Sequence, residues 1–116
     1  MKNEFGLLES DMISIREELR KHKSVEGAIL FGSRAKGNFR PGSDVDLALK
    51  GKSLDFETIS QISYFLNEET LMPYKFDVVN YHSIQEPELV LHIDRVGIEL
   101  FNRKKESQLV EAIKGS

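Results

Sequence analysis

The sequence predicts an α/β fold in which helices pack on one small mixed sheet of three to four strands. Two patterns alternate along its 116 residues. In one, apolar residues recur every three or four positions, which is typical of amphipathic helices; in the other, short β-favouring apolar runs end at glycine or polar residues. This alternation favours helices layered on a sheet. The length is that of one domain, so we expect residues 1–116 to form a single domain.

The first helix and strand are predicted in the N-terminal third. Residues 1–23 carry one apolar stripe at helical spacing, formed by Leu8, Met12, Ile15 and Leu19. Residues 25–31 are an apolar, β-favouring run that ends at Gly32, as a buried strand would.

A glycine-rich loop and a second strand come next. Residues 32–43 are rich in glycine and cations and predict a loop with at most one helical turn, over residues 33–36. Residues 44–50 predict a strand, in which side chains alternate between the two faces. Asp44 and Asp46 therefore share a face, opposite the apolar face of the same strand.

Five further elements are predicted in the second half of the chain. The same two patterns indicate a helix over residues 55–70, a strand over 74–80, a helix that begins near Ser83 or Pro87 and ends at Gly97, a strand over 98–101 and a terminal helix over 103–114.

Composition excludes several classes of function. Apolar residues make up 40% and charged residues 30%, as in globular proteins. The formal net charge of −3 argues against a nucleic-acid partner. The absence of cysteine excludes disulfides and thiolate chemistry. The acidic N-terminal segment is unlike a secretory signal, and no apolar run is long enough to cross a bilayer, so we expect a cytoplasmic protein with no membrane partner.

A candidate phosphate site lies where the first strand ends. Gly32 lets the backbone approach a ligand closely, and the amides and hydroxyl that follow at Ser33 can face an anion. Arg34, Lys36 and Arg40 lie beside this junction and could balance phosphate charge. Taken alone, a Gly-Ser turn and three cations are also typical of an ordinary surface loop.

Three carboxylates form a candidate metal site. Asp44 and Asp46, two residues apart on a strand, place their Cα atoms about 7 Å apart on one face. Their repulsion is relieved by a cation, and carboxylate oxygens suit Mg²⁺. Asp77 is a charge within an apolar strand and requires a partner or a metal, unless it lies on the solvated face of an edge strand.

Other motifs are not supported. The segment from Gly32 to Gly37 matches the start of a P-loop, but the Lys-Ser/Thr that must follow is missing. There is no dinucleotide-binding glycine motif. His22, His82 and His92 show no metal-ligand spacing, and we interpret them as structural or surface residues.

The spacing of these residues resembles a known family. Gly32-Ser33, ten further residues and then Asp44-x-Asp46 is the pattern of nucleotidyltransferases of the DNA polymerase beta superfamily, and the third carboxylate, Asp77, follows on a later strand. In length, order of elements and the stretch GSRAKG, the chain is similar to the minimal nucleotidyltransferases (MNT). The resemblance covers nearly the whole chain, although its specific motifs occupy about a third of it.

The resemblance implies a site and a reaction. Gly32 and Ser33 would hold the triphosphate of ATP, together with Arg34 and Lys36. The residues Asp44, Asp46 and Asp77 would ligate two Mg²⁺ ions, and Asp77 would also activate the attacking hydroxyl. Larger family members carry a second domain for the acceptor, and this chain has no room for one, so a separate molecule must present it.

The resemblance also implies a partner. MNT proteins are often paired with a HEPN-domain ribonuclease as antitoxin and toxin, and in studied pairs they neutralise the toxin by AMPylation of a tyrosine. Two alternatives stay open: an antitoxin that blocks its partner by binding alone, and a transferase acting on a small molecule. The base preference, the number of nucleotides transferred and the oligomeric state, which includes a homo-oligomer, are also open.

Overall fold

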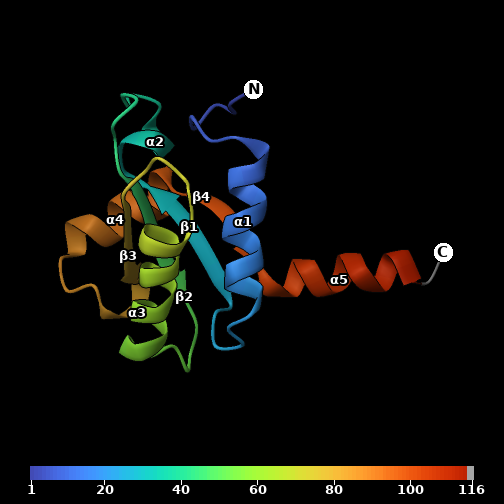
Figure 1. Ribbon diagram of the computed structural model, residues 1–116. Helices are drawn as coiled ribbons and strands as arrows, with labels where there is room; N and C mark the ends of the chain where they lie inside the picture. The colour runs from blue at the N-terminus through green and yellow to red at the C-terminus, as the bar shows by residue number, and fades with distance from the viewer. Residues whose placement is uncertain (115–116) are drawn as a thin grey trace.

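A four-stranded mixed sheet forms the centre of the computed structural model, which describes residues 1–114 (Figure 1). The strand order is β3-β2-β1-β4; β1 runs antiparallel to both of its neighbours, whereas β2 and β3 are parallel. This confirms the predicted α/β class with a small mixed sheet. The strands span β1 Gly27–Phe31, β2 Val45–Lys50, β3 Phe76–Asn80 and β4 Ile98–Asn102, each close to its predicted bounds.

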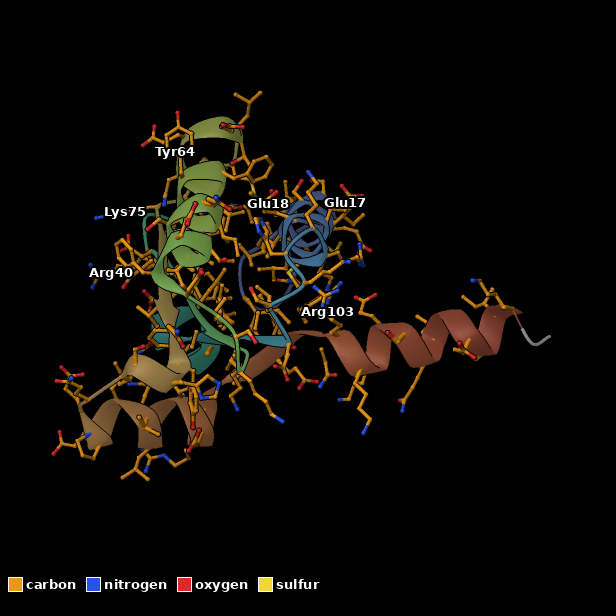
Figure 2. All side chains as sticks on the ribbon, turned by 90° about the horizontal axis from the view of Figure 1, so that it is seen from below. Glu17, Glu18, Arg40, Tyr64, Lys75 and Arg103 are labelled. Atoms are coloured by element: carbon orange, nitrogen blue, oxygen red, sulfur yellow. The ribbon has the colours of Figure 1, made fainter. Side chains whose placement is uncertain are left out.

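Helices cover both faces of this sheet. Figure 2 shows α1 and α3 on one side and α4 on the other, while α5 extends away from the sheet. Among residues 1–114, no helix combines the length and the apolar character needed to cross a membrane. The helices span α1 Glu9–Arg20, α2 Gly32–Lys36, α3 Phe56–Tyr64, continued by a π-helical turn at Phe65–Glu69, α4 Pro87–Val96 and α5 Arg103–Lys114; a 3₁₀ turn, Tyr81–Ser83, follows β3.

Two apolar clusters separate the layers. The larger cluster lies under α1 and α3 and includes Leu30 and Leu47 of the central strands, both fully buried. The smaller cluster lies under α4 and joins Phe31, Ala48 and Ile93. Because side chains alternate along a strand, the residues of β2 that do not enter the larger cluster face α4. Asp46 is one of these.

The N-terminal segment differs from the prediction. Instead of a helix over residues 1–23, α1 begins only at Glu9, and the segment before it turns back on itself through a bridge between Lys2 and Leu8. Gly6 has a φ of +77°, a left-handed conformation that interrupts a helix. The segment nevertheless packs on the core, because Leu7 is fully buried.

The glycine-rich loop contains one short helix, in agreement with the single turn predicted there. It runs from Gly32 to Lys36 and ends at Gly37, which has a φ of +85° and accommodates the left-handed conformation common after a helix. This helix follows β1 directly, so Gly32 lies at the C-terminal end of that central strand.

Candidate active site

Two of the predicted acids lie side by side on neighbouring strands. In the parallel pairing of β2 and β3, Asp46 is in register with Asp77. Residues in register on adjacent strands are about 4.8 Å apart and present their side chains on the same face. Asp44 immediately precedes β2, two residues from Asp46. The sheet therefore brings together the three acids that the sequence analysis selected, on the face that α4 partly covers.

The acids differ in exposure. Asp46 is half-buried, whereas Asp44 and Asp77 are exposed. Asp46 is flanked by β1 on one side, where it pairs with Phe31, and by β3 on the other. Asp77 lies on the edge strand of the sheet and is open to solvent. The two exposed acids can thus reach a bound molecule, with Asp46 between the strands.

Gly32 lies directly against the Asp46 carboxylate. Its φ is +75°, and a Cβ at this position would collide with Asp46 Oδ2. Both facts require glycine: the backbone conformation is strained for other residues, and a side chain would displace the acid. The close approach joins the acids to the Gly-Ser bend, as the sequence spacing predicts.

Burial and neighbouring charge act on Asp46. Burial makes the largest contribution to a raised pKa of this carboxyl, followed by the negative charges of Asp77 and Asp44, while the Arg34 cation opposes the rise. Asp77 and Asp44 are therefore both close enough to repel the ionised form of Asp46. A divalent cation among them would relieve this repulsion.

The donor chemistry fits such a cation, although the side chains are not gathered around one point. Three carboxylates supply hard oxygen ligands of the kind that Mg²⁺ prefers. Within the part of the chain that the structure describes, no three histidine or acidic side chains are close enough together to hold a metal ion. Binding a cation would thus require the acids to turn toward one another.

The predicted cations lie in different surroundings. Ser33 is partly exposed in the first turn of α2, and Lys36 is exposed at its end. Arg40 lies in the following loop and is exposed. Arg34, in contrast, is only 1% exposed, and its guanidinium donates hydrogen bonds to main-chain carbonyls. Lys36 is therefore free to face a ligand, whereas Arg34 is committed to the protein interior.

One site residue is not predicted by the sequence. His92 of α4 accepts a hydrogen bond from the Gly32 amide through Nε2, at 3.2 Å, and its ring packs edge-on against Phe31. Its position in the sequence indicates only a structural or surface residue. Sixty residues separate it from Gly32, and no local spacing indicates the contact; only the packing of α4 on the sheet brings the two together.

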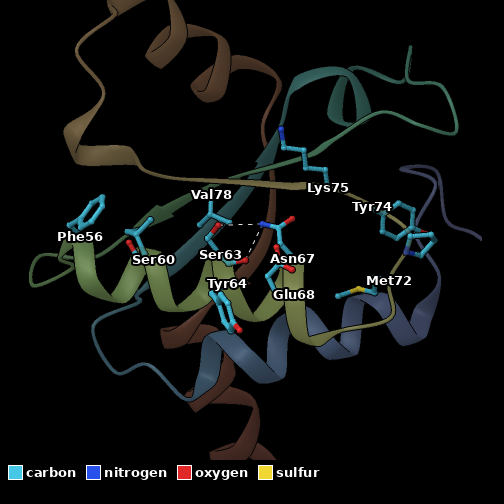
Figure 3. A pocket seen from close by; sticks show the side chains of 12 residues that line it. Phe56, Ser60, Ser63, Tyr64, Asn67, Glu68, Met72, Tyr74, Lys75 and Val78 are labelled. Atoms are coloured by element: carbon cyan, nitrogen blue, oxygen red, sulfur yellow. Dashed lines mark hydrogen bonds between the residues drawn. The ribbon is translucent and has the colours of Figure 1, made fainter.

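A hollow of about 880 Å³ lies elsewhere, between α3 and the outer edge of β3 (Figure 3). It is lined by aromatic and polar side chains that include Tyr64, Asn67 and Lys75, and by none of the acids or the Gly-Ser bend. Val78, which also lines it, points to the α3 face, whereas Asp77 points to the α4 face. The hollow and the acid cluster are separate.

A mixed sheet of this order, with acids in register beside a glycine bend, defines a nucleotidyltransferase-type fold. The family model described as "Polymerase beta, Nucleotidyltransferase" matches residues 14–106. The chain belongs to this family. None of the curated proteins compared matches it significantly.

Solved structures with the same fold are distant in sequence. A toxin–antitoxin crystallised with AMP-PNP is 22% identical, with a TM-score of 0.66 over 92% of this chain and 86% of that one. The toxin–antitoxin MntA-HepT is 20% identical, with a TM-score of 0.63 over 92% and 85%. An MNT antitoxin in complex with the tri-AMPylated HEPN toxin of Shewanella oneidensis is 20% identical, with a TM-score of 0.61 over 89% and 81%.

Proposed function

We propose that this protein is a Mg²⁺-dependent nucleotidyltransferase that moves an adenylyl group from ATP to a hydroxyl group of a HEPN-domain toxin, and so acts as an antitoxin. The observation that carries the proposal is the position of Asp46, in register with Asp77 and against the backbone of Gly32. The neighbours in fold add support, since one is a complex with AMP-PNP and another contains an AMPylated HEPN toxin.

Each site residue has a defined part in this proposal. The amides of Gly32 and Ser33, the Ser33 hydroxyl and the exposed Lys36 bind the triphosphate. A phosphate oxygen that takes the Gly32 amide must displace His92, which accepts from it in the structure. Two Mg²⁺ ions, held by the carboxylates of Asp44, Asp46 and Asp77, would neutralise the charge that develops on the phosphates.

The reaction is an in-line displacement. The acceptor hydroxyl oxygen attacks the α-phosphorus, a new P–O bond forms, and the bond between the α-phosphorus and the bridging oxygen breaks, so that pyrophosphate leaves. Asp77, exposed on the edge strand, accepts the hydroxyl proton. The remaining acids and the loop hold the triphosphate in line with the attacking oxygen, which lowers the entropic part of the barrier.

The test uses the position of a radioactive label. The protein is mixed with Mg²⁺, the product of the neighbouring gene and ATP labelled either on the α- or on the γ-phosphate. We expect covalent label on the partner from the α-phosphate alone, and none with Asp44→Asn. Glu57→Gln, which removes an exposed carboxylate of α3, is the control and should keep full transfer. Equal labelling by wild type and Asp44→Asn would contradict the proposal.

A non-catalytic antitoxin is the second candidate. It is favoured by one observation: among the described residues, the acids are not gathered for a metal. Such a protein would neutralise the partner's toxicity without transferring label, and Asp44→Asn would neutralise it equally well. The same experiment therefore separates the two candidates.

A further inference from the structure

Arg34 is a buried cation with an unusual set of partners. It is 1% exposed, and among the described residues no carboxylate forms an ion pair with it; the hydrogen bonds of its guanidinium go to carbonyl oxygens. Burying a charge costs free energy unless hydrogen bonds compensate it. A residue kept at this cost, beside three acids, has a structural or functional purpose that its neighbours should reveal.

Its hydrogen bonds reach the main chain on both sides of the Asp44 Cα. Nη2 donates to the Ser43 carbonyl at 2.8 Å, and Nε lies within bonding distance of the Ser43 and Asp44 carbonyls, at 3.2 and 3.3 Å. These two carbonyls belong to the peptide planes on either side of the Asp44 Cα. The second plane is also held at its other end, because the Val45 amide donates to the Lys75 main-chain carbonyl at 2.8 Å. Fixing both planes fixes the direction of the Asp44 Cα–Cβ bond.

The guanidinium is itself held firmly. Nη1 donates to the Phe5 carbonyl at 2.9 Å and approaches that of Gly6, so the N-terminal segment closes over it. The rings of Phe39 and Tyr74 lie 5.1 and 4.9 Å from its Cζ, within the range of cation–π attraction. Because the guanidinium is planar and held on several sides, it can fix the positions of the carbonyl groups that it binds.

From this geometry we infer that Arg34 is a positioning residue, which aims the Asp44 carboxylate at the metal site and carries no contact with the nucleotide. This differs from the sequence prediction that Arg34 binds the triphosphate. The inference rests on the proposed function, since Asp44 requires aiming only if it binds a cation. Asp44 is exposed and has no hydrogen bond to its carboxylate among the described contacts, so its main chain is what orients it.

The positive charge of Arg34 is a separate property from this hydrogen-bond geometry, and the two can be tested apart. A lysine at this position would keep the charge but has a single ammonium group, which cannot hold the carbonyls on both sides of residue 44 and that of Phe5 together. Arg34→Lys therefore separates geometry from charge.

Arg103 offers a matched control. Its guanidinium also donates to main-chain carbonyls, those of Leu19, Val25 and His22, and also lies over an aromatic ring, Phe101, at 5.3 Å. Figure 2 shows it at the base of α5, beside α1. Arg103→Lys removes the same kind of contacts without touching the acid cluster.

Four measurements on wild type, Arg34→Lys and Arg103→Lys test the inference. Melting temperature reports the structural loss, which we expect in both variants. Calorimetric titration with Mg²⁺ and AMP-PNP reports binding, and we expect the Mg²⁺ requirement of Arg34→Lys alone to rise roughly 10–100-fold, as for residues that orient metal ligands. Hydrogen exchange without metal should quicken at residues 43–45 in Arg34→Lys alone. In transfer assays, kcat should fall more than the KM for ATP rises.

The outcomes are distinct. If Arg34→Lys needs no more Mg²⁺ than Arg103→Lys at equal loss of stability, Arg34 is only structural and the inference is wrong. A raised KM for ATP with unchanged Mg²⁺ affinity would instead restore Arg34 as a nucleotide ligand. If wild type binds no Mg²⁺–AMP-PNP, the proposed function fails first and the inference with it. Should Arg34→Lys not fold, Tyr74→Leu, which removes one aromatic face from the guanidinium, is expected to raise the Mg²⁺ requirement in the same way.

Discussion

Replacing Gly32 by alanine should lower both the melting temperature and the activity, and a second glycine separates the two causes. Gly37 has a similar positive φ, +85° against +75°, but a Cβ there would meet nothing within 4 Å. An alanine in the left-handed region costs about 1–2 kcal/mol. At roughly 4 °C per kcal/mol, a value between those for smaller and larger domains, Gly37→Ala should lower Tm by about 4–8 °C.

Gly32→Ala carries the same backbone strain and a collision in addition. Its Cβ would overlap the Asp46 carboxylate, and forcing extra atoms into a packed site typically costs about 1–3 kcal/mol. The sum is roughly 2–5 kcal/mol, or about 8–20 °C in Tm. Because the acid is displaced, label transfer should fall on the order of 10²-fold, the loss expected from a misplacement of about 1 Å. Gly37→Ala should keep its transfer rate.

A double-mutant cycle measures the collision directly. In an Asp46→Ala background there is no carboxylate to displace, so Gly32→Ala should then cost only the backbone strain, the same as Gly37→Ala. Thermal melting of the single and double variants gives the coupling. If Gly32→Ala and Gly37→Ala destabilise equally, and Asp46→Ala changes nothing, the close approach that joins the acids to the Gly-Ser bend is not real.

Four further predictions concern acidic residues and the sheet edge. Because the pKa of Asp46 is raised in the folded state, its ionised form destabilises the fold at pH values above the pKa of the unfolded state, about 3.8. Asp46→Asn should therefore raise Tm at pH 7 without metal. This gain should vanish as the pH falls to about 3.8. The Asp55 carboxyl has a lowered pKa because it accepts a hydrogen bond from the Thr58 amide, so Asp55→Asn should lower Tm at pH 7. Thermal melts across pH should show the opposite effects of the two substitutions on Tm. Asp77→Ala should lose about 10²–10⁴-fold in label transfer with little change in Tm, because the side chain is exposed; wild-type turnover would remove Asp77 from the mechanism. The Asn67 side chain forms hydrogen bonds with both the amide and the carbonyl of Phe76 on the edge strand. Asn67→Ala should therefore lower the free energy of unfolding by about 1–3 kcal/mol and increase self-association in light scattering. A variant that stays monomeric would refute the role of Asn67 in protecting the sheet edge.

The strands and the shared face of the acids could be predicted because they depend on local patterns. Alternation along residues 44–50 places Asp44 and Asp46 on one face, and the structure shows Leu47 on the other, in the larger cluster. The register that pairs Asp46 with Asp77 has no local signal. This register depends on where α3 and the turn after it place the start of β3 beside β2. A shift of one residue would turn Asp77 to the opposite face.

The surroundings of Arg34 could not be predicted for a different reason. A cation in a glycine-rich loop is typical of solvated surface, and burial of Arg34 depends on two distant segments. The N-terminal residues cover it through the carbonyl of Phe5, and Tyr74 supports it from the chain before β3. The same fold-back explains why α1 starts at Glu9: the segment before it lies over the cation, through the carbonyls of Phe5 and Gly6, instead of extending the helix.

The burial of Arg34 and the repulsion within the acid cluster have one common explanation. Burial, and then the negative charges of Asp77 and Asp44, raise the pKa of Asp46, so its ionised form destabilises the fold. A buried cation that forms no ion pair among the described residues is a second cost, although its charge partly offsets the first. Amides in place of the acids would avoid the first cost, whereas an apolar residue at 34 would leave the carbonyls of Phe5 and Ser43 without the hydrogen bonds that the guanidinium donates. Both features fit the proposed function, in which a divalent cation would relieve the repulsion among the acids and Arg34, bonded to main-chain carbonyls, would orient one of them.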